Sequence, residues 1–192
     1  GIHLRSRGRG IVVAVCVAGS IAGGLALAPD HAFGDTQPIE MGTATANHTW
    51  TTVPLQQQFE NPVVIVGPPS MAGGQTAFAR VRRVTSTSFE VRVQEWSNAD
   101  DRHSIEQIPY LVLEAGTYEV GGYRWHAGHI VNARTTPVDV SNERLGLAGN
   151  RVVLSSVVSE RDSSPAVPIV DVGGGGFSLR LTEESTADGR HG

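Results

Sequence analysis

The densest group of chemically capable side chains is the run Asp100-Asp101-Arg102-His103, which follows Trp96 after a short polar segment. Carboxylates accept hydrogen bonds from neighbouring sugar hydroxyls, and a guanidinium group donates several hydrogen bonds in a fixed geometry. An indole ring offers a flat apolar surface on which the C–H face of a sugar stacks. This combination predicts a metal-free carbohydrate-binding site, formed by Trp96, Ser97, Asp100, Asp101, Arg102, His103 and Arg80.

Each of these residues also has a purely structural interpretation. Consecutive aspartates are common in turns, and an arginine beside them often only fixes the loop. Strand alternation places Trp96 on the outward face, where the alternative to a ligand is a loop or a neighbouring protomer. Arg80, Arg82 and Arg92 share that face, and pairing across strands with Glu90 is the simpler role for them. The sequence leaves both interpretations open.

Several classes of function are disfavoured by the composition. The formal net charge is -4 and the sequence contains no lysine, so the basic face of a nucleic-acid-binding protein is lacking. Neither a Gly-x-Ser-x-Gly nor a His-Glu-x-x-His motif occurs. His126 and His129 are three residues apart, and on a strand this spacing points them to opposite faces. We therefore expect no catalysis, no metal site and no cofactor.

Residues 1–36 are predicted to be an export signal with a short linker. Three arginines within the first nine residues precede the uncharged stretch 11–28, IVVAVCVAGSIAGGLALA. Its Ala-Leu-Ala ending is typical of a signal cleavage site, and Pro29 favours a cut a few residues later, near Ala32. An uncleaved membrane anchor and a buried core helix are the alternatives. We expect a helical signal segment and a secreted protein, which keeps no thiol if Cys16 is removed with the signal.

The rest of the chain is typical of an antiparallel all-β protein. Short runs rich in β-branched residues are separated by Gly, Pro, Asn, Asp and Ser. Residues 89–96 alternate cleanly, and residues 63–66 (VVIV) suit a strand that is buried on both faces. About six strands in roughly 80 residues predict a small β-sandwich over residues 37–120. Its expected core residues are Phe89, Val91, Val93, Val64 and Ile65.

An internal repeat predicts a second domain over residues 121–192. Residues 89–104 (FEVRVQEWSNADDRHS) align without gaps to residues 177–192 (FSLRLTEESTADGRHG), at an offset of 88. The identical pairs include Phe89/Phe177, Arg92/Arg180, Glu95/Glu183, Ala99/Ala187, Asp100/Asp188, Arg102/Arg190 and His103/His191. The second copy lacks a counterpart of residues 108–114, so we expect it to be a truncated sandwich and the chain to be part of a longer reading frame.

Residues 59–114 resemble the H-type lectin domain, through the segments NPVVIVG, ARVRRVTSTSFEVRVQEW and IPYLVLEAG. The resemblance implies a six-stranded antiparallel sandwich that often forms trimers and binds galactose or N-acetylgalactosamine without metal. Trp96 matches the tryptophan beside the sugar in that family. Ser97 and Thr76 stand where the family has its sugar-contacting histidine and arginine, and Glu184 replaces the tryptophan in the second copy.

These observations predict a secreted glycan-binding protein that is multivalent through its two copies. We expect glycans and further copies of the chain as partners, without nucleic acid and without membrane association once the signal is removed. The alternatives are a structural or adhesive protein and an accessory module of a larger secreted protein or enzyme.

Overall fold

The protein is all-β, as the sequence predicts. The computed structural model describes residues 11–20, 39–96, 99–120, 123–145, 148–158 and 165–183. Its elements are β1 (Ile11–Ser20), β2 (Ile39–Ala46), β3 (Thr51–Pro54), β4 (Pro62–Val66), β5 (Ala77–Arg82), β6 (Ser88–Glu95), β7 (Glu106–Glu114), β8 (Gly116–Val120), β9 (Tyr123–Ala133), β10 (Val138–Ser141), α1 (Asn142–Leu145), β11 (Ala148–Val158), β12 (Ala166–Gly173) and β13 (Gly176–Glu183). No helix in these ranges is long and apolar enough to span a membrane.

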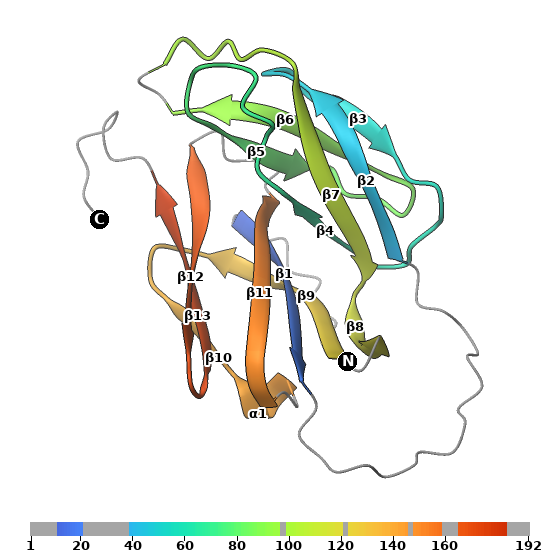
Figure 1. The fold of residues 1–192 in the computed structure, drawn as a ribbon, viewed down its shortest axis with the longest axis vertical. Helices are drawn as coiled ribbons and strands as arrows, with labels where there is room; N and C mark the ends of the chain where they lie inside the picture. Colours follow the sequence, from blue (N-terminus) through green and yellow to red (C-terminus); the bar gives the residue numbers. More distant parts are fainter. Residues whose placement is uncertain are drawn as a thin grey trace.

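The first half of the chain packs two layers of strands against each other. One layer is the antiparallel sheet β2-β7-β4, and the other is formed by β3, β6 and β5 (Figure 1). The core between the two layers contains Phe89, Val91 and Val93 of β6, which are at most 1% exposed. They lie on one face of the strand because every second side chain of a strand points to the same side. Val64 joins them in this core, whereas Ile65 is buried in a different cluster.

The second half has its own apolar core. The sheet β10-β13-β12 pairs in register, with Val140 opposite Phe177 and Val170 opposite Leu179. The core contains Phe177, Leu179 and Leu181 from β13, and Val157 from β11 packs with them. The apolar face that the repeat predicts for residues 177–181 is therefore the buried face.

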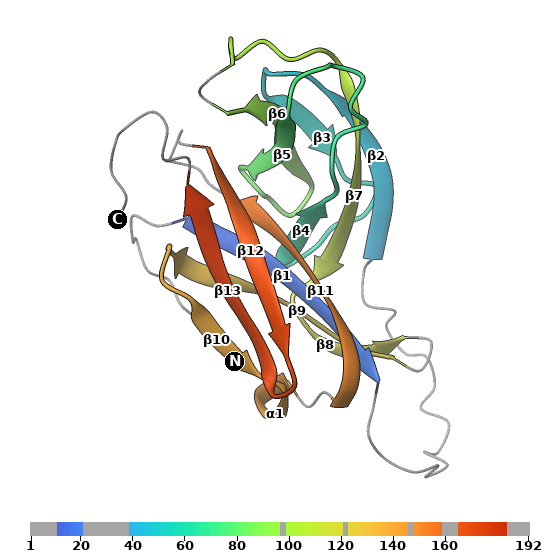
Figure 2. The same ribbon diagram turned by 60° about the vertical axis from the view of Figure 1, so that its left-hand side comes forward.

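The N-terminal apolar stretch differs from the prediction. A helix is expected over residues 11–28, but residues 11–20 form strand β1, which pairs antiparallel with both β9 and β11 (Figure 2). Residues 21–28 lie outside the described residues. The physical reason is twofold. Valines stiffen the chain toward the extended conformation, and the position between β9 and β11 supplies hydrogen-bond partners on both sides.

The two halves pack against each other through a third apolar cluster. Val63, Ile65 and Leu113 of the first half contact Ala127 of the second, so β4 is buried on both faces as predicted. The Ser156 hydroxyl accepts from the Val66 N–H at 2.8 Å. A single parallel bridge, Val158 to Val81, also joins β11 to β5. One sheet therefore runs through both halves in the order β3-β6-β5-β11-β1-β9-β8, whereas the sequence predicts two separate sandwiches.

Candidate functional site

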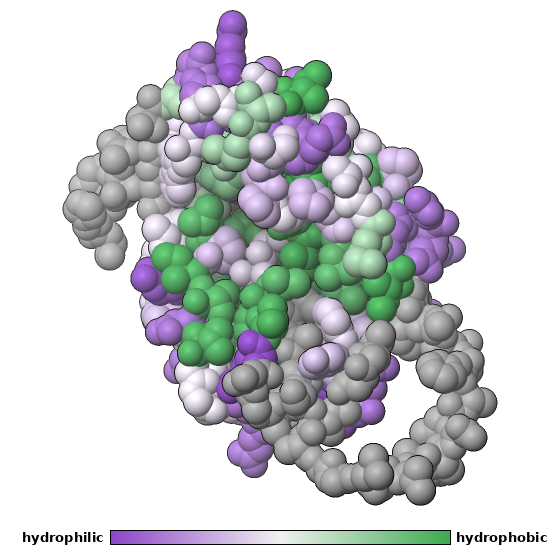
Figure 3. All heavy atoms as spheres, viewed as in Figure 1, coloured by the Kyte–Doolittle hydropathy of each residue, from purple (hydrophilic) through white to green (hydrophobic). Residues whose placement is uncertain are grey.

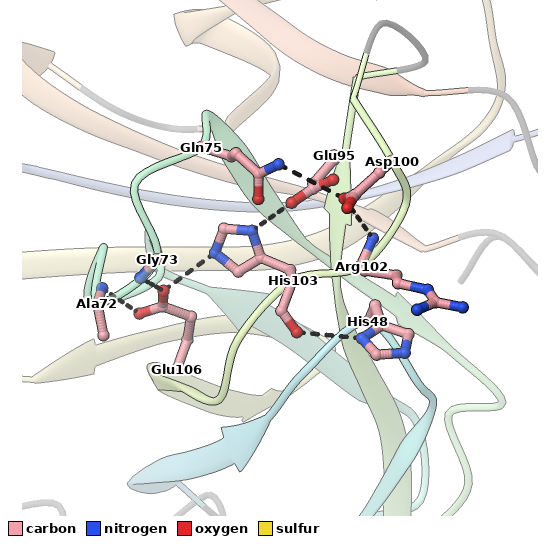
Figure 4. A network of polar contacts seen from close by, with 9 residues as sticks. All are labelled: His48, Ala72, Gly73, Gln75, Glu95, Asp100, Arg102, His103 and Glu106. Atoms are coloured by element: carbon pink, nitrogen blue, oxygen red, sulfur yellow. Dashed lines mark hydrogen bonds and ion pairs between the residues drawn. The ribbon is translucent and has the colours of Figure 1, made fainter.

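The polar loop singled out in the sequence joins the end of β6 to the start of β7. Asp100, Asp101 and Arg102 are exposed, and the Arg102 side chain extends away from the protein interior (Figure 4). The Asp100 Oδ1 atom accepts hydrogen bonds from the Arg102 N–H at 3.2 Å and from the Gln75 amide at 3.5 Å. Asp101 has a φ of 56°, a left-handed conformation that aspartate tolerates better than most residues. The loop therefore presents two carboxylates and a guanidinium on a defined backbone.

His103 lies beneath this loop and is not on the surface. Its Nδ1 atom is 2.7 Å from Glu95 Oε1, and its Nε2 atom is 3.0 Å from Glu106 Oε1 (Figure 4). Carboxylate oxygens only accept, so both hydrogen bonds form together when both ring nitrogens carry a proton. The side chains of this Glu95–His103–Glu106 network are at most 1% exposed. A surface ligand does not reach His103, which the sequence places among the ligand contacts, because the network needs both of its ring nitrogens.

Glu106 anchors the network to the neighbouring loop. Its Oε2 accepts from the Ser70 hydroxyl at 2.5 Å and from the Ala72 N–H at 2.8 Å, and its Oε1 accepts from the Gly73 N–H at 2.7 Å. Burial raises the pKa of Glu106, but the hydrogen bonds from Gly73, Ser70, Ala72 and His103 outweigh it and hold the pKa at about 2. Glu106 is thus a buried carboxylate that stays ionised.

A further contact ties the loop to the segment between β2 and β3. The backbone carbonyl of His103 lies 3.0 Å from His48 Nδ1, so this nitrogen of His48 is the donor. The Glu95 Oε2 atom is buried and has no hydrogen-bond partner among the described residues. Glu95 therefore holds His103 through one oxygen only.

Trp96 follows directly after β6 and is half-buried. Its ring packs against Phe78 of β5, with centroids 5.3 Å apart and planes tilted by 49°. Phe78 also lines a cleft of about 180 Å³ between the halves, beside Pro68 and Pro168. This cleft is smaller than the roughly 300 Å³ at which pockets for small-molecule ligands begin, and Trp96 is not among the residues that line it.

Arg80 does not belong to that surface. It is 1% exposed, and its Nη1 donates to Gln94 Oε1 at 2.7 Å. The sequence places Arg80 and Gln94 on the outward face of their strands, but this face is covered in the folded chain. The structure thus brings Trp96 and the exposed loop to one end of β6 and leaves Arg80 and His103 beneath the surface. Ser97 lies outside the described residues, as do Glu184, Asp188, Arg190 and His191 of the second copy.

The outward face of β5 and β6 carries a stacked group that the sequence analysis did not predict. The guanidinium of Arg82 lies 4.1 Å and that of Arg92 lies 4.9 Å from the centroid of the Trp50 ring. The pairing expected across strands is present, because Arg82 Nε is 2.5 Å from Glu90 Oε2. Arg82 lowers the pKa of Glu90 through this hydrogen bond. Burial lowers the pKa of Arg92, which the nearby charge of Asp101 partly offsets.

His126 and His129 have different neighbours in the fold. They lie on β9 at positions of opposite alternation, and His126 Nδ1 is engaged with the Thr117 hydroxyl at 2.7 Å. Burial is the main cause that lowers the pKa of each imidazole. Among the described residues, no group of three or more His, Cys, Asp or Glu side chains is arranged to hold a metal ion.

One signal in the sequence pointed to the buried network. Glu95 and His103 are both kept in the second copy, as Glu183 and His191, whereas Trp96 is replaced there. A pair of residues that is retained where the half-buried tryptophan is lost suggests a structural role for the pair. Nothing in the sequence indicated that Glu106 is the third member of the network. Its place there depends on how β7 lies beside the loop around Gly73, whose N–H donates to Glu106.

Comparison with known proteins gives one partial similarity. The chain is 49% identical over 74 residues to Halomucin of Haloquadratum walsbyi (strain DSM 16790 / HBSQ001), a match that covers 34% of this chain and 1% of that protein. The chain thus spans about a hundredth of the length of that relative. No family model matches the chain, and no solved structure matches it.

Proposed function

We propose that this chain is an exported, non-enzymatic, metal-free carbohydrate-binding protein with two modules of one architecture. Each module is a six-stranded antiparallel sandwich similar to the H-type lectin domain. The observation that carries the proposal is the aromatic pair Phe78–Trp96 at the end of β6, from which the exposed loop of Asp100, Asp101 and Arg102 continues. An apolar platform next to directional polar groups matches the composition of a sugar surface.

The order of the strands supports the two-module part of the proposal. β7 lies between β2 and β4, and β1 lies between β9 and β11. The opposite layers have the orders β3-β6-β5 and β10-β13-β12. Corresponding strands take corresponding places, with β1 where the first module has β7. Phe89 and Phe177, which open the repeated motif, are both buried in their respective cores.

In this proposal the exposed residues contact the sugar, and the buried residues hold the exposed ones in position. Trp96 would stack on the apolar face of a sugar, while Asp100 and Asp101 accept from its hydroxyls and Arg102 donates to them. His103 would hold the loop from below through Glu95 and Glu106, and Arg80 would fix β5 to β6 through Gln94. Galactose or N-acetylgalactosamine is the ligand class that the family resemblance favours.

Weak binding at one site would be offset by several sites acting together. The two modules, and a trimer of the kind found among H-type lectins, would each add sites and raise the avidity. The second module is expected to bind more weakly or differently, because Glu184 stands in place of the tryptophan. Export would be directed by the arginine-flanked apolar segment. N-terminal sequencing of the secreted protein decides whether that segment is cleaved or retained as β1.

The experiment that tests the binding site uses the full chain on a glycan array, followed by calorimetry on the hits with chelator present throughout. Trp96→Ala is expected to weaken binding about 5- to 150-fold, if stacking on a sugar is worth about 1–3 kcal/mol as it is for nucleic-acid bases. Tyr123→Ala is the matched control, since Tyr123 is an aromatic residue on β9 that is 54% exposed. Equal losses in both variants, or unchanged binding in Trp96→Ala, would place the site elsewhere. Loss of wild-type binding with chelator would contradict the metal-free part.

A structural or adhesive role is the second candidate. It is favoured by the partial similarity to Halomucin, of which this chain matches only a small part. In this role the sandwiches would mainly act as building units of a longer surface protein. A folded wild-type chain that binds no glycan on the array would favour this candidate over the first.

A further inference from the structure

The position between β9 and β11 differs in one respect from its counterpart in the first half. There, β7 starts eleven residues after the end of β6 and inserts between β2 and β4. In the second half the strand at this place is β1, which comes from the other end of the chain (Figure 1). All of the first half, residues 39–120, separates β1 from β9 in the sequence. The strand is thus supplied from outside the module that it completes.

Main-chain pairing holds β1 in this position. Each of residues 13–20 has a partner residue on β9 and another on β11. Both pairings are antiparallel, as they are for β7 with β2 and β4. The sequence IVVAVCVAGS carries no charge and suits a central strand that is covered on both faces. These bonds depend on the strand and its two neighbours, and not on the connection that delivers the strand.

The position would not remain empty in a folded chain. Without β1, both β9 and β11 present an unpaired edge in the middle of a sheet. The core would lose part of its cover at Ile130, Val153 and Val157, which lie opposite residues 13 and 17 of β1. Val152 and Leu154 of β11 are already 60% and 39% exposed, and Figure 3 shows apolar surface in the region of β11 and β12. An extended apolar strand is the occupant that satisfies both edges.

We propose that this position is a strand-acceptor site, and that residues 11–20 of a second copy of the chain occupy it when copies associate. The proposal rests on the proposed two-module architecture and on retention of residues 11–20 in the exported chain. The connection over residues 21–38 reaches on the order of 60 Å when extended, enough for a strand to seat in its own chain or in a neighbour. The bonds are the same in both cases, which is the condition for exchange of an identical element between protomers. Strand addition of this kind also joins subunits in other assemblies.

Two complementary variants test the exchange. In the donor-defective variant, Val15→Pro with Cys16→Pro, β1 loses two N–H groups and cannot pair as a central strand. The acceptor-defective variant is Val152→Pro with Val153→Pro on β11. Successive N–H groups point to opposite sides of a strand, so one of the two prolines removes an N–H that faces β1. Mixing the two full-length variants is expected to give a 1:1 heterodimer by light scattering after size exclusion. A chain that carries all four substitutions is the control and should join neither variant.

A peptide provides an independent readout if a variant aggregates. A synthetic peptide of residues 5–20 is added to the donor-defective chain, and amide hydrogen exchange is followed in β9 and β11. Protection of both strands by the peptide, and not by a peptide with the two proline substitutions, is the expected result. Absence of the heterodimer together with unchanged exchange would overturn the proposal. Glycan binding at Trp96 is measured separately in the same samples, so failure of the lectin function and failure of strand exchange are told apart.

Discussion

The Nε2 atom of His103 lies 3.0 Å from Oε1 of Glu106, and neither side chain is exposed. The two residues are three positions apart, at the point where the exposed loop turns into β7. Their contact, extended by Glu95, closes the base of the loop that carries Asp100, Asp101 and Arg102. The stability of the candidate site is therefore expected to depend on a buried polar network beneath the loop.

Removal of the central imidazole tests this dependence. His103→Gln removes the imidazole that joins Glu95 to Glu106, and leaving buried polar groups without a hydrogen-bond partner costs about 1–3 kcal/mol of unfolding free energy. Urea denaturation followed by tryptophan fluorescence measures the loss. The neighbouring change Arg102→Gln affects an exposed side chain and should stay within about 0.5 kcal/mol of wild type. Similar values for both variants would mean that the network contributes little.

Two adjacent glycines provide a test of the packing against His103. A Cβ atom at Gly73 would lie 2.8 Å from His103 Nε2, whereas a Cβ at Gly74 would meet nothing within 4 Å. Gly73→Ala is therefore expected to lower the free energy of unfolding by about 1–3 kcal/mol, as overpacking does. Gly74→Ala should change it by at most about 0.5 kcal/mol. Equal losses of stability in the two variants, measured by thermal or urea unfolding, would show that the backbone around Gly73 is not packed tightly against His103.

The lowered pKa of Glu106 predicts a specific acid sensitivity. Because the pKa falls from an ordinary value of 4.5 to about 2 on folding, the stabilisation is complete above about pH 5 and is lost as the pH drops toward 2. Unfolding midpoints in urea between pH 2 and pH 6 should therefore fall with acid. The Glu106→Gln variant should be less stable at pH 6 and should lose less on acidification. Glu90 also has a lowered pKa, so wild type and variant are compared at each pH. Parallel curves would contradict the assignment to Glu106.

Phe89 and Phe177, the buried phenylalanines that open the repeated motif, test whether the halves are independent modules. Phe89 is 0% and Phe177 is 5% exposed, and truncation of a buried phenylalanine to alanine costs about 3–5 kcal/mol. Hydrogen exchange should show loss of protection in β2 to β7 for Phe89→Ala and in β10 to β13 for Phe177→Ala. Uniform loss across both halves in either variant would indicate one cooperative unit, joined through the cluster of Val63, Leu113 and Ala127.

Local patterns predicted the strands and their buried faces. Alternation identified Phe89, Val91 and Val93 as core, and the continuous run around Val63 as a strand buried on both sides. The helix expected over residues 11–28 was wrong for residues 11–20, because an apolar segment takes its conformation from the partners available to it. The alternation pattern placed Arg80 on the outward face but did not predict that it is buried. Alternation shows which side chains share a face of the strand, and not whether other elements cover that face.

The sequence by itself determined the all-β class, the inward face of β6 and the repeated motif that starts at Phe89 and Phe177, because these depend on the period of a strand and on residue identity. Only the tertiary structure decided that His103 is enclosed by Glu95 and Glu106, that Arg82 and Arg92 stack on Trp50, and that residues 11–20 lie between β9 and β11. The contacts of Trp50 and of residues 11–20 join segments that are distant in the chain, and His103 meets Glu95 and Glu106 through the way the loop between β6 and β7 folds back. Their partners are chosen by strand order and by the packing of whole layers, which local periodicity does not encode.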